Sequence, residues 1–283
     1  MSKKQEYILF IFEGKKTEPL IFENLKKYFL EKKESKITQD IIISYGTVIY
    51  RLYKEFFIDD ILDEDLDLVT ILKPTNKDAN IVTRGSVSEI YLFFDYDNHA
   101  SNADDSKLFK MLDLFNNETE KGKLFISYPM VEALQHIKSD IDFKNIVAKC
   151  EKIYKQEVKA NCNHEFLHFN DYSINIWNYL IKEHIKKANF IVNDKYEYNN
   201  EIIEQLLIFE NQKEKYIKKN NKVAVLSSFP LFLLNYYGLD KLIYLLESLK
   251  AREERKYNPQ NYVTIDDYKA YEEFDNKVGN EQW

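Results

Sequence analysis

The sequence predicts an α/β fold in which a parallel sheet core is followed by a helical second half. Over the first part of the chain, short apolar runs that stop at Gly, Asp or Glu alternate with segments of helical spacing, as in βαβ units. From about residue 140 onward, the apolar residues recur mainly at helical spacing. We therefore expect a sheet domain at residues 1–140 and a mainly helical region at residues 141–283.

The first strand and the first helix follow each other at the start of the chain. Residues 7–12 (YILFIF) are apolar and bulky, which is typical of a strand buried on both faces, and the run stops at Glu13. Thr17 is the expected N-cap of a helix that continues to Phe29, with Glu18 in its first turn. Glu18 complements the dipole of this helix, whereas a charge directly after an apolar strand, as at Glu13, requires a metal or another cation.

The other elements are predicted from the same periodicities. Further strands are expected at residues 40–45, 89–94 and 122–127, and residues 223–226 fit either a short strand or an extended segment. Helices are expected at residues 49–61, 106–115, 142–157, 172–190, 199–218 and 231–249, and another one begins within residues 128–134. Residues 66–72 fit either a strand or the end of a helix, residues 74–88 fit a loop, and residues 252–283 fit a peripheral tail.

Charge and composition limit the classes of function. The formal net charge of −7 argues against general electrostatic binding of nucleic acid, and lysine pairs such as Lys186–Lys187 are interpreted mainly as solvated helix faces. The sequence has no uncharged run that is long enough to span a bilayer and no signal-peptide pattern. We therefore expect a cytoplasmic protein without a membrane partner, in which Cys150 and Cys162 are reduced thiols.

Carboxylates stand at the ends of three predicted strands. Glu13 follows the first strand, Asp95 and Asp97 follow the strand at residues 89–94, and Glu132 comes shortly after the strand at residues 122–127. Because neighbouring parallel strands end at the same edge of a sheet, these side chains are expected to converge there. Converging carboxylates suit a hard divalent ion, Mg²⁺ or Mn²⁺. The expected chemistry is metal-assisted phosphoryl transfer.

Three motifs carry a resemblance to a known family. The segments EGKKTEP, FFDYD and SYPMVEAL, which begin at residues 13, 93 and 127, resemble the TOPRIM domains of RloB-like and abortive-infection proteins, which are related to OLD-type nucleases. The resemblance covers about the first half of the chain. It implies a Rossmann-like parallel core that binds Mg²⁺ and cleaves nucleic acid, either DNA or RNA, tRNA being one candidate.

The same resemblance implies roles for individual residues. Glu13 matches the general acid/base or first metal ligand, and Asp95 and Asp97 match the metal-binding aspartates. Glu18 matches a second acid, and Glu132 resembles a further acid of OLD-like sites. The sequence departs from OLD proteins because it contains no G-x-x-x-x-G-K-[ST] motif. An ATPase or sensor that activates this chain would thus be a separate protein of an anti-phage system. The sequence leaves the oligomeric state open, and a homo-oligomer is one possibility.

Two other functions compete with the nuclease. His164, Glu165 and His168 match the H-E-x-x-H motif of zinc peptidases, with Glu183 as a downstream third ligand, but Asn and Asp residues around the motif disfavour the long helix that it requires. His99, which follows the aspartates, is interpreted as a loop residue. The second alternative is a non-catalytic interaction module whose acids cap helices and hold one structural ion.

Overall fold

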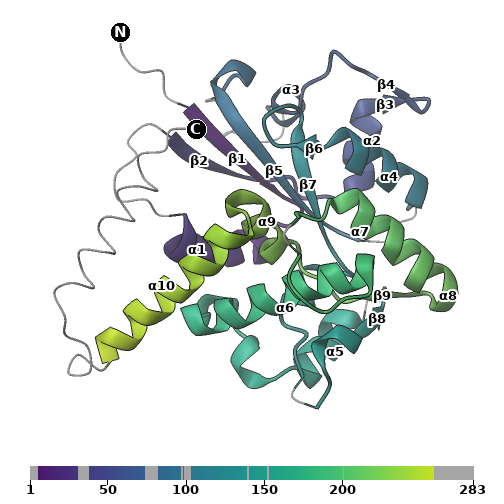
Figure 1. The fold of residues 1–283 in the computed structure, drawn as a ribbon. Coiled ribbons are helices and arrows are strands. Elements are labelled where there is room, and N and C mark those ends of the chain that lie inside the picture. Colours follow the sequence, from purple (N-terminus) through teal and green to yellow (C-terminus); the bar gives the residue numbers. More distant parts are fainter. Residues whose placement is uncertain are drawn as a thin grey trace, which may run out of the picture.

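A mostly parallel sheet forms the centre of the protein (Figure 1). The computed structural model describes residues 6–30, 38–73, 82–96, 98, 103–138, 140–151, 153–199 and 201–257. The strand order is β2-β1-β5-β7-β6, and the bounds are β1 Glu6–Phe12, β2 Thr38–Ser44, β5 Val87–Asp95, β7 Gly122–Ser127 and β6 Asn116–Asn117. The first four strands are parallel and β6 is antiparallel to β7. This topology confirms the predicted α/β class with a parallel core.

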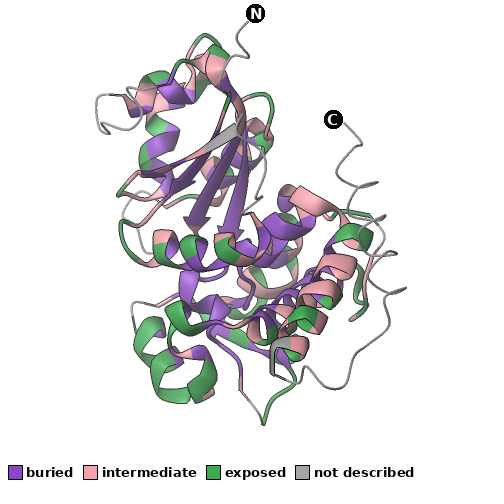
Figure 2. Ribbon diagram, turned by 90° about the vertical axis from the view of Figure 1, so that its left-hand side faces the viewer, coloured by how far each residue is buried: buried purple, intermediate pink, exposed green. Residues whose placement is uncertain are grey.

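The central strands are buried on both faces. In β1, residues 8–12 are all buried, although successive side chains point to opposite faces. A strand that is covered on both sides needs apolar residues throughout, which explains the unbroken run YILFIF. Figure 2 shows the same burial along the neighbouring strands.

Helices from both halves of the chain cover one face of the sheet. They are α1 (Thr17–Phe29) and α9 (Ser228–Tyr237). Phe22 of α1 packs on Phe10 with the ring centroids 4.3 Å apart. Phe232 of α9 packs edge-on against Tyr91 of β5 at 4.9 Å, and also contacts Phe10 at 5.8 Å. The aromatic core of the sheet is therefore completed by a helix from the second half of the chain.

Helices α2 (Ile49–Phe56) and α4 (Asp105–Leu114) pack together on the other side of the sheet (Figure 1). Phe56 meets Phe115 edge-on at 5.2 Å. The predicted helix at residues 49–61 is too long, because Asp59 and Asp60 adopt positive φ angles and turn the chain into the hairpin β3 (Phe57–Ile58) and β4 (Ile61–Leu62). Residues 68–72 form the short helix α3 (Leu68–Leu72).

The second half is mainly helical, as predicted. Its helices are α5 Tyr154–Asn161, α6 Ile174–Asn193, α7 Gln205–Gln212, the π-helix Lys213–Ile217, α8 Lys218–Asn220, α9 and α10 Leu239–Tyr257. It also contains a small antiparallel sheet of β8 (Val147–Lys149) and β9 (Lys222–Ala224). Short 3-10 helices lie at Arg84–Ser86, Val131–Leu134, Phe143–Asn145, His164–Phe166 and Phe169–Asp171. Among the helices of the described residues, none is long and apolar enough to cross a membrane.

Several predicted boundaries in this region are wrong. Residues 142–157 form a 3-10 turn, strand β8 and the start of α5, because β8 pairs with β9, which is distant in the sequence. Residues 128–134 contain a single 3-10 turn, and α7 begins only at Gln205. Gly238 separates α9 from α10 with a φ of 72°. Lys16, one residue before Thr17, is the N-cap of α1.

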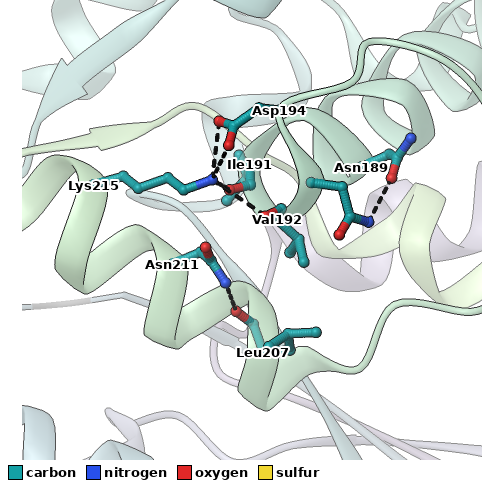
Figure 3. Close-up of polar contacts among 8 residues, drawn as sticks. Asn189, Ile191, Val192, Asp194, Leu207, Asn211 and Lys215 are labelled. Carbon is teal, nitrogen blue, oxygen red and sulfur yellow. Dashed lines mark hydrogen bonds and ion pairs between the residues drawn. The ribbon is translucent and has the colours of Figure 1, made fainter.

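Two lysines of the second half donate hydrogen bonds to backbone carbonyl groups. Lys187, predicted on a solvated face, is fully buried and donates to the carbonyl oxygens of Phe143 (2.8 Å) and Ile146 (2.6 Å). Burial lowers its pKa well below the usual value. Lys215, in the π-helix, reaches the C-terminal end of α6 (Figure 3), where it donates to the carbonyl oxygen of Ile191 at 2.8 Å and pairs with Asp194 at 3.0 Å.

Candidate functional site

Glu13 and Asp95 meet at the C-terminal edge of the sheet. Glu13 directly follows β1, and its backbone continues the sheet, since its N–H donates to the carbonyl oxygen of Phe93 at 2.9 Å and its carbonyl oxygen accepts from Gly46 at 2.8 Å. Oε2 of Glu13 accepts a hydrogen bond from the backbone N–H of Asp95 at 3.1 Å. Asp95 is the last residue of β5. The register of the parallel strands thus brings together two acids that are 82 positions apart in the sequence.

Glu18 folds back from the first turn of α1 toward the end of β1. Its Oε1 accepts a hydrogen bond from the backbone N–H of Gly14 at 2.9 Å, and the residue is 7% exposed. A Cβ atom at Gly14 would lie only 2.3 Å from Oε2 of Glu18. Glycine is therefore the residue that lets this carboxylate lie against the backbone.

Glu132 reaches the same edge from the 3-10 turn after β7. It is 3% exposed, and its Oε1 lies 2.5 Å from Nζ of Lys155 on α5. Burial raises the pKa of the neighbouring Tyr154, and the charges of Glu132 and Asp95, among others, raise it further. The hydroxyl of Tyr154 is 2.9 Å from Nδ1 of His136. The first residues of α5 therefore lie next to this edge of the sheet.

The carboxylates influence each other electrostatically. Burial is the largest cause of the strongly raised pKa of Asp95, and the charges of Glu13, Glu18 and Glu132 raise it further, whereas a hydrogen bond from the backbone of Val131 lowers it. Burial also raises the pKa of Glu18, and the charge of Glu132 adds to this effect. We call these four residues, Glu13, Glu18, Asp95 and Glu132, the acid cluster.

The donor set of the acid cluster suits a hard cation, although its side chains are now held by protein groups. Among the residues that the structure describes, no three His, Cys, Asp or Glu side chains are arranged to hold a metal ion. Each carboxylate instead accepts a hydrogen bond from the backbone or pairs with Lys155, as described above. The side-chain oxygens of the acid cluster are all carboxylate oxygens, which Mg²⁺ and Mn²⁺ prefer as ligands. A divalent ion would also reduce the repulsion between these carboxylates. The chemical type of these side chains is therefore suitable for a divalent ion.

The structure describes four of the five acids that the sequence predicts as metal ligands. Asp97 and His99 lie outside the described residues. Lys155, Tyr154 and His136 were not predicted to belong to the site, because a lysine or tyrosine on a surface helix carries no local signal of a distant partner. Burial lowers the pKa of His136 to about 4, so its imidazole is neutral near pH 7.

The H-E-x-x-H segment lacks the helix that zinc peptidases use. His164 begins a 3-10 helix of three residues, and His168 lies beyond its end. The two imidazole rings are 6.3 Å apart at nearly perpendicular planes. Glu183, on α6, pairs with Lys186 at 3.0 Å and accepts from the hydroxyl of Tyr196 at 2.7 Å. The segment is therefore an exposed turn and not one face of a rigid helix.

The chain was also compared with known proteins. No family model, no curated protein and no solved structure matches it. Its function is therefore inferred from its own residues, above all from the acid cluster at the edge of the sheet.

Proposed function

We propose that this chain is a Mg²⁺-dependent nuclease that hydrolyses phosphodiester bonds of DNA or RNA, with tRNA among the candidate substrates. The observation that carries the proposal is the meeting of Glu13 and Asp95 at the C-terminal edge of a parallel sheet, with Oε2 of Glu13 3.1 Å from the backbone nitrogen of Asp95. Ligand sites of open α/β sheets lie at this edge. The resemblance of the three segments that begin at residues 13, 93 and 127 to TOPRIM nucleases supports the same activity.

In this proposal, Glu13, Asp95 and Asp97 hold the ion, and Glu18 and Glu132 assist them. A bound Mg²⁺ or Mn²⁺ supplies electrostatic stabilisation of the phosphate oxygens and lowers the pKa of a coordinated water. Asp95, with its raised pKa, binds a proton more readily than an exposed aspartate does, and that proton is released when a cation replaces it. The Gly14 N–H orients Glu18, and Lys155 orients Glu132.

The proposal extends to the biological context. The resemblance supports a role as the nucleic-acid-cleaving effector of an anti-phage, abortive-infection system. Because the sequence contains no P-loop motif, we assign ATP hydrolysis or phage sensing to a separate partner protein. Because the net charge is acidic, we assign phosphate binding to a local basic region or to that partner.

One observation favours a second function, a non-catalytic interaction module. Every described member of the acid cluster already accepts from a backbone N–H or from Lys155, as acids with a purely structural role do. In that case the carboxylates stabilise the strand ends, and a cation adds stability without chemistry. The two functions differ in whether a phosphodiester bond is cut.

Cleavage assays on the purified protein test the proposal. Labelled DNA, RNA and tRNA are incubated in Mg²⁺, Mn²⁺ or EDTA with the wild type, Asp95→Ala and His164→Ala. We expect cutting that needs the ion, is lost in Asp95→Ala and is kept in His164→Ala. Cutting that survives Asp95→Ala contradicts the proposed site. Inertness on every substrate, together with Mn²⁺ binding measured by calorimetry, supports the interaction module.

A further inference from the structure

A groove on the helical half lies apart from the acid cluster. Its volume is about 590 Å³, and it is formed by residues 137, 138 and 140–143, the 3-10 helix His164–Phe166 and one face of α6. Phe143 and Phe166 line it with buried rings. Ile141 and Tyr179 also line it, and they are 41% and 44% exposed. The groove thus offers uncovered apolar surface to a ligand.

The charged residues that line the groove are mostly acidic. They are the carboxylates Asp140, Asp142, Glu165 and Glu183 and the single amine of Lys138. Asp142 and Glu183 each have a lysine partner outside the groove. Asp140 and Glu165 are exposed, and no ion pair among the described residues includes either of them. We call this feature the acidic groove.

Tyr179 is the point at which the apolar and acidic features meet. Its ring packs against Phe166 with the centroids 5.9 Å apart. Burial raises its pKa, and the charges of Glu183, Glu165 and Asp142 raise it further. These three carboxylates line the same groove as the tyrosine. An aromatic face among carboxylates is the environment that binds a guanidinium or ammonium group, through cation–π contact and charge-assisted hydrogen bonds.

We propose that the acidic groove docks a segment of a partner protein in which Arg or Lys stands next to an apolar side chain. The cationic group would lie between Tyr179, Asp140 and Glu165, and the apolar side chain would cover Ile141. This inference goes beyond the proposed nuclease and does not depend on it.

Charge decides against other occupants. The chain's own tail, residues 258–283, contains six acidic residues and two lysines, so the groove repels it. A nucleic acid is repelled for the same reason. A second copy of this chain has a net charge of −7 and is a poor partner for an acidic surface.

Selection of binding peptides tests the proposal with the full chain. A displayed library of random peptides is panned on the wild type and, in parallel, on the double variant Asp140→Asn/Glu165→Gln, whose altered side chains are exposed and whose folding is checked by circular dichroism. Peptides enriched on the wild type are then synthesised with a fluorescein label, and their affinities are measured by fluorescence anisotropy at low and high salt. The matched control is Glu210→Gln/Asp240→Asn, which removes two exposed charges outside the groove.

We expect enriched peptides that combine Arg or Lys with an apolar neighbour. Their affinity should fall about tenfold or more in the double variant and in Tyr179→Ala, should weaken with salt, and should be unchanged in the control. The proposal is overturned if no peptide is enriched, if the enriched peptides lack basic residues, or if they bind the double variant equally well. Self-association of the wild type that disappears in the double variant would also overturn it, because a second copy would then be the occupant.

Discussion

Nζ of Lys155 lies 2.5 Å from Oε1 of Glu132 and brings a positive charge from the helical half to the acid cluster. The glutamate is 3% exposed as a residue, whereas the lysine side chain is 48% exposed. Lys155 is thus the protein cation that compensates one buried carboxylate of a cluster in which Asp95 and Glu18 have raised pKa values. The acid cluster therefore depends on both halves of the chain.

Removal of this cation should destabilise the metal-free protein. We expect Lys155→Ala to lower the free energy of unfolding by about 1–2 kcal/mol in EDTA, because it leaves the buried Glu132 carboxylate without its partner while water replaces only part of the interaction. Urea denaturation measures the change. Lys159→Ala, which removes an exposed lysine of the same helix, is the control and should change stability little. Equal effects of both substitutions would show that the ion pair contributes nothing.

Substitution of two glycines by alanine should affect different properties, Mn²⁺ binding at Gly14 and stability at Gly238. At Gly14, alanine would displace the Glu18 carboxylate, since the new Cβ would lie 2.3 Å from Oε2, so we expect weaker Mn²⁺ binding with the fold retained. Gly238 has no atom within 4 Å of the added Cβ but has a φ of 72°, so alanine there should cost about 1 kcal/mol of stability and leave Mn²⁺ binding unchanged. Calorimetric titration with Mn²⁺ and thermal unfolding separate the two effects. Unchanged Mn²⁺ affinity in Gly14→Ala would remove Glu18 from the site.

The raised pKa of Asp95 predicts how stability depends on pH. A carboxyl whose folded pKa is raised binds a proton more tightly in the folded state than in the unfolded state. Its stabilising effect is complete below the unfolded pKa of about 3.9 and is lost as the pH rises through the folded pKa. We therefore expect Asp95→Asn, in EDTA at pH 7, to increase the free energy of unfolding by about 0.5–2 kcal/mol and to flatten its pH dependence.

Denaturation of the wild type and Asp95→Asn at a series of pH values checks this prediction. Glu18, whose pKa is also raised, should contribute a slope of the same sign that remains in Asp95→Asn. Added Mg²⁺ should stabilise the wild type and have a smaller effect on the variant. A variant that is less stable than the wild type at pH 7 would show that the Asp95 charge is compensated within the protein.

Lys215 should stabilise the end of α6. It donates to the carbonyl oxygens of Ile191 and Val192 and pairs with Asp194, so Lys215→Ala should lower the free energy of unfolding by about 1–2 kcal/mol. Chemical denaturation measures the loss, and Lys219→Ala, an exposed lysine of α8, serves as the comparison. Hydrogen exchange at the last turn of α6 should accelerate only in Lys215→Ala, and uniform exchange in both variants would contradict this role.

The elements that could be predicted from the sequence are those whose signal is local. β7 begins and ends where predicted, at Gly122 and Ser127, because the apolar residues 124–126 stand between a glycine and a serine that is followed by Tyr128 and Pro129. The helix that ends at Phe29 was also predicted from a local signal, the helical spacing of its apolar residues. The coarse fold class follows from these elements, whereas the assignment to the TOPRIM family stays a prediction.

What could not be predicted depends on contacts between distant segments. β8 has three residues, and it is a strand only because β9 pairs with it across more than 70 positions. The interaction of Lys155 with Glu132 likewise requires α5 to lie over the sheet edge, which no local pattern encodes. The hairpin at residues 57–62 was missed because Asp59 and Asp60 adopt a left-handed conformation that glycine or asparagine would have signalled more clearly.

The rings of α9 on the sheet limit how the protein can be shortened. Phe229 stacks on Phe93 at 5.1 Å and Phe232 meets Phe125 at 6.0 Å, so strands from the first half are covered by aromatic side chains of a helix that is synthesised after them. We expect a fragment that ends near residue 140 to expose the apolar face of these strands to solvent and therefore to aggregate. The smallest unit that can be produced for crystallography or enzymology must therefore extend past Tyr237.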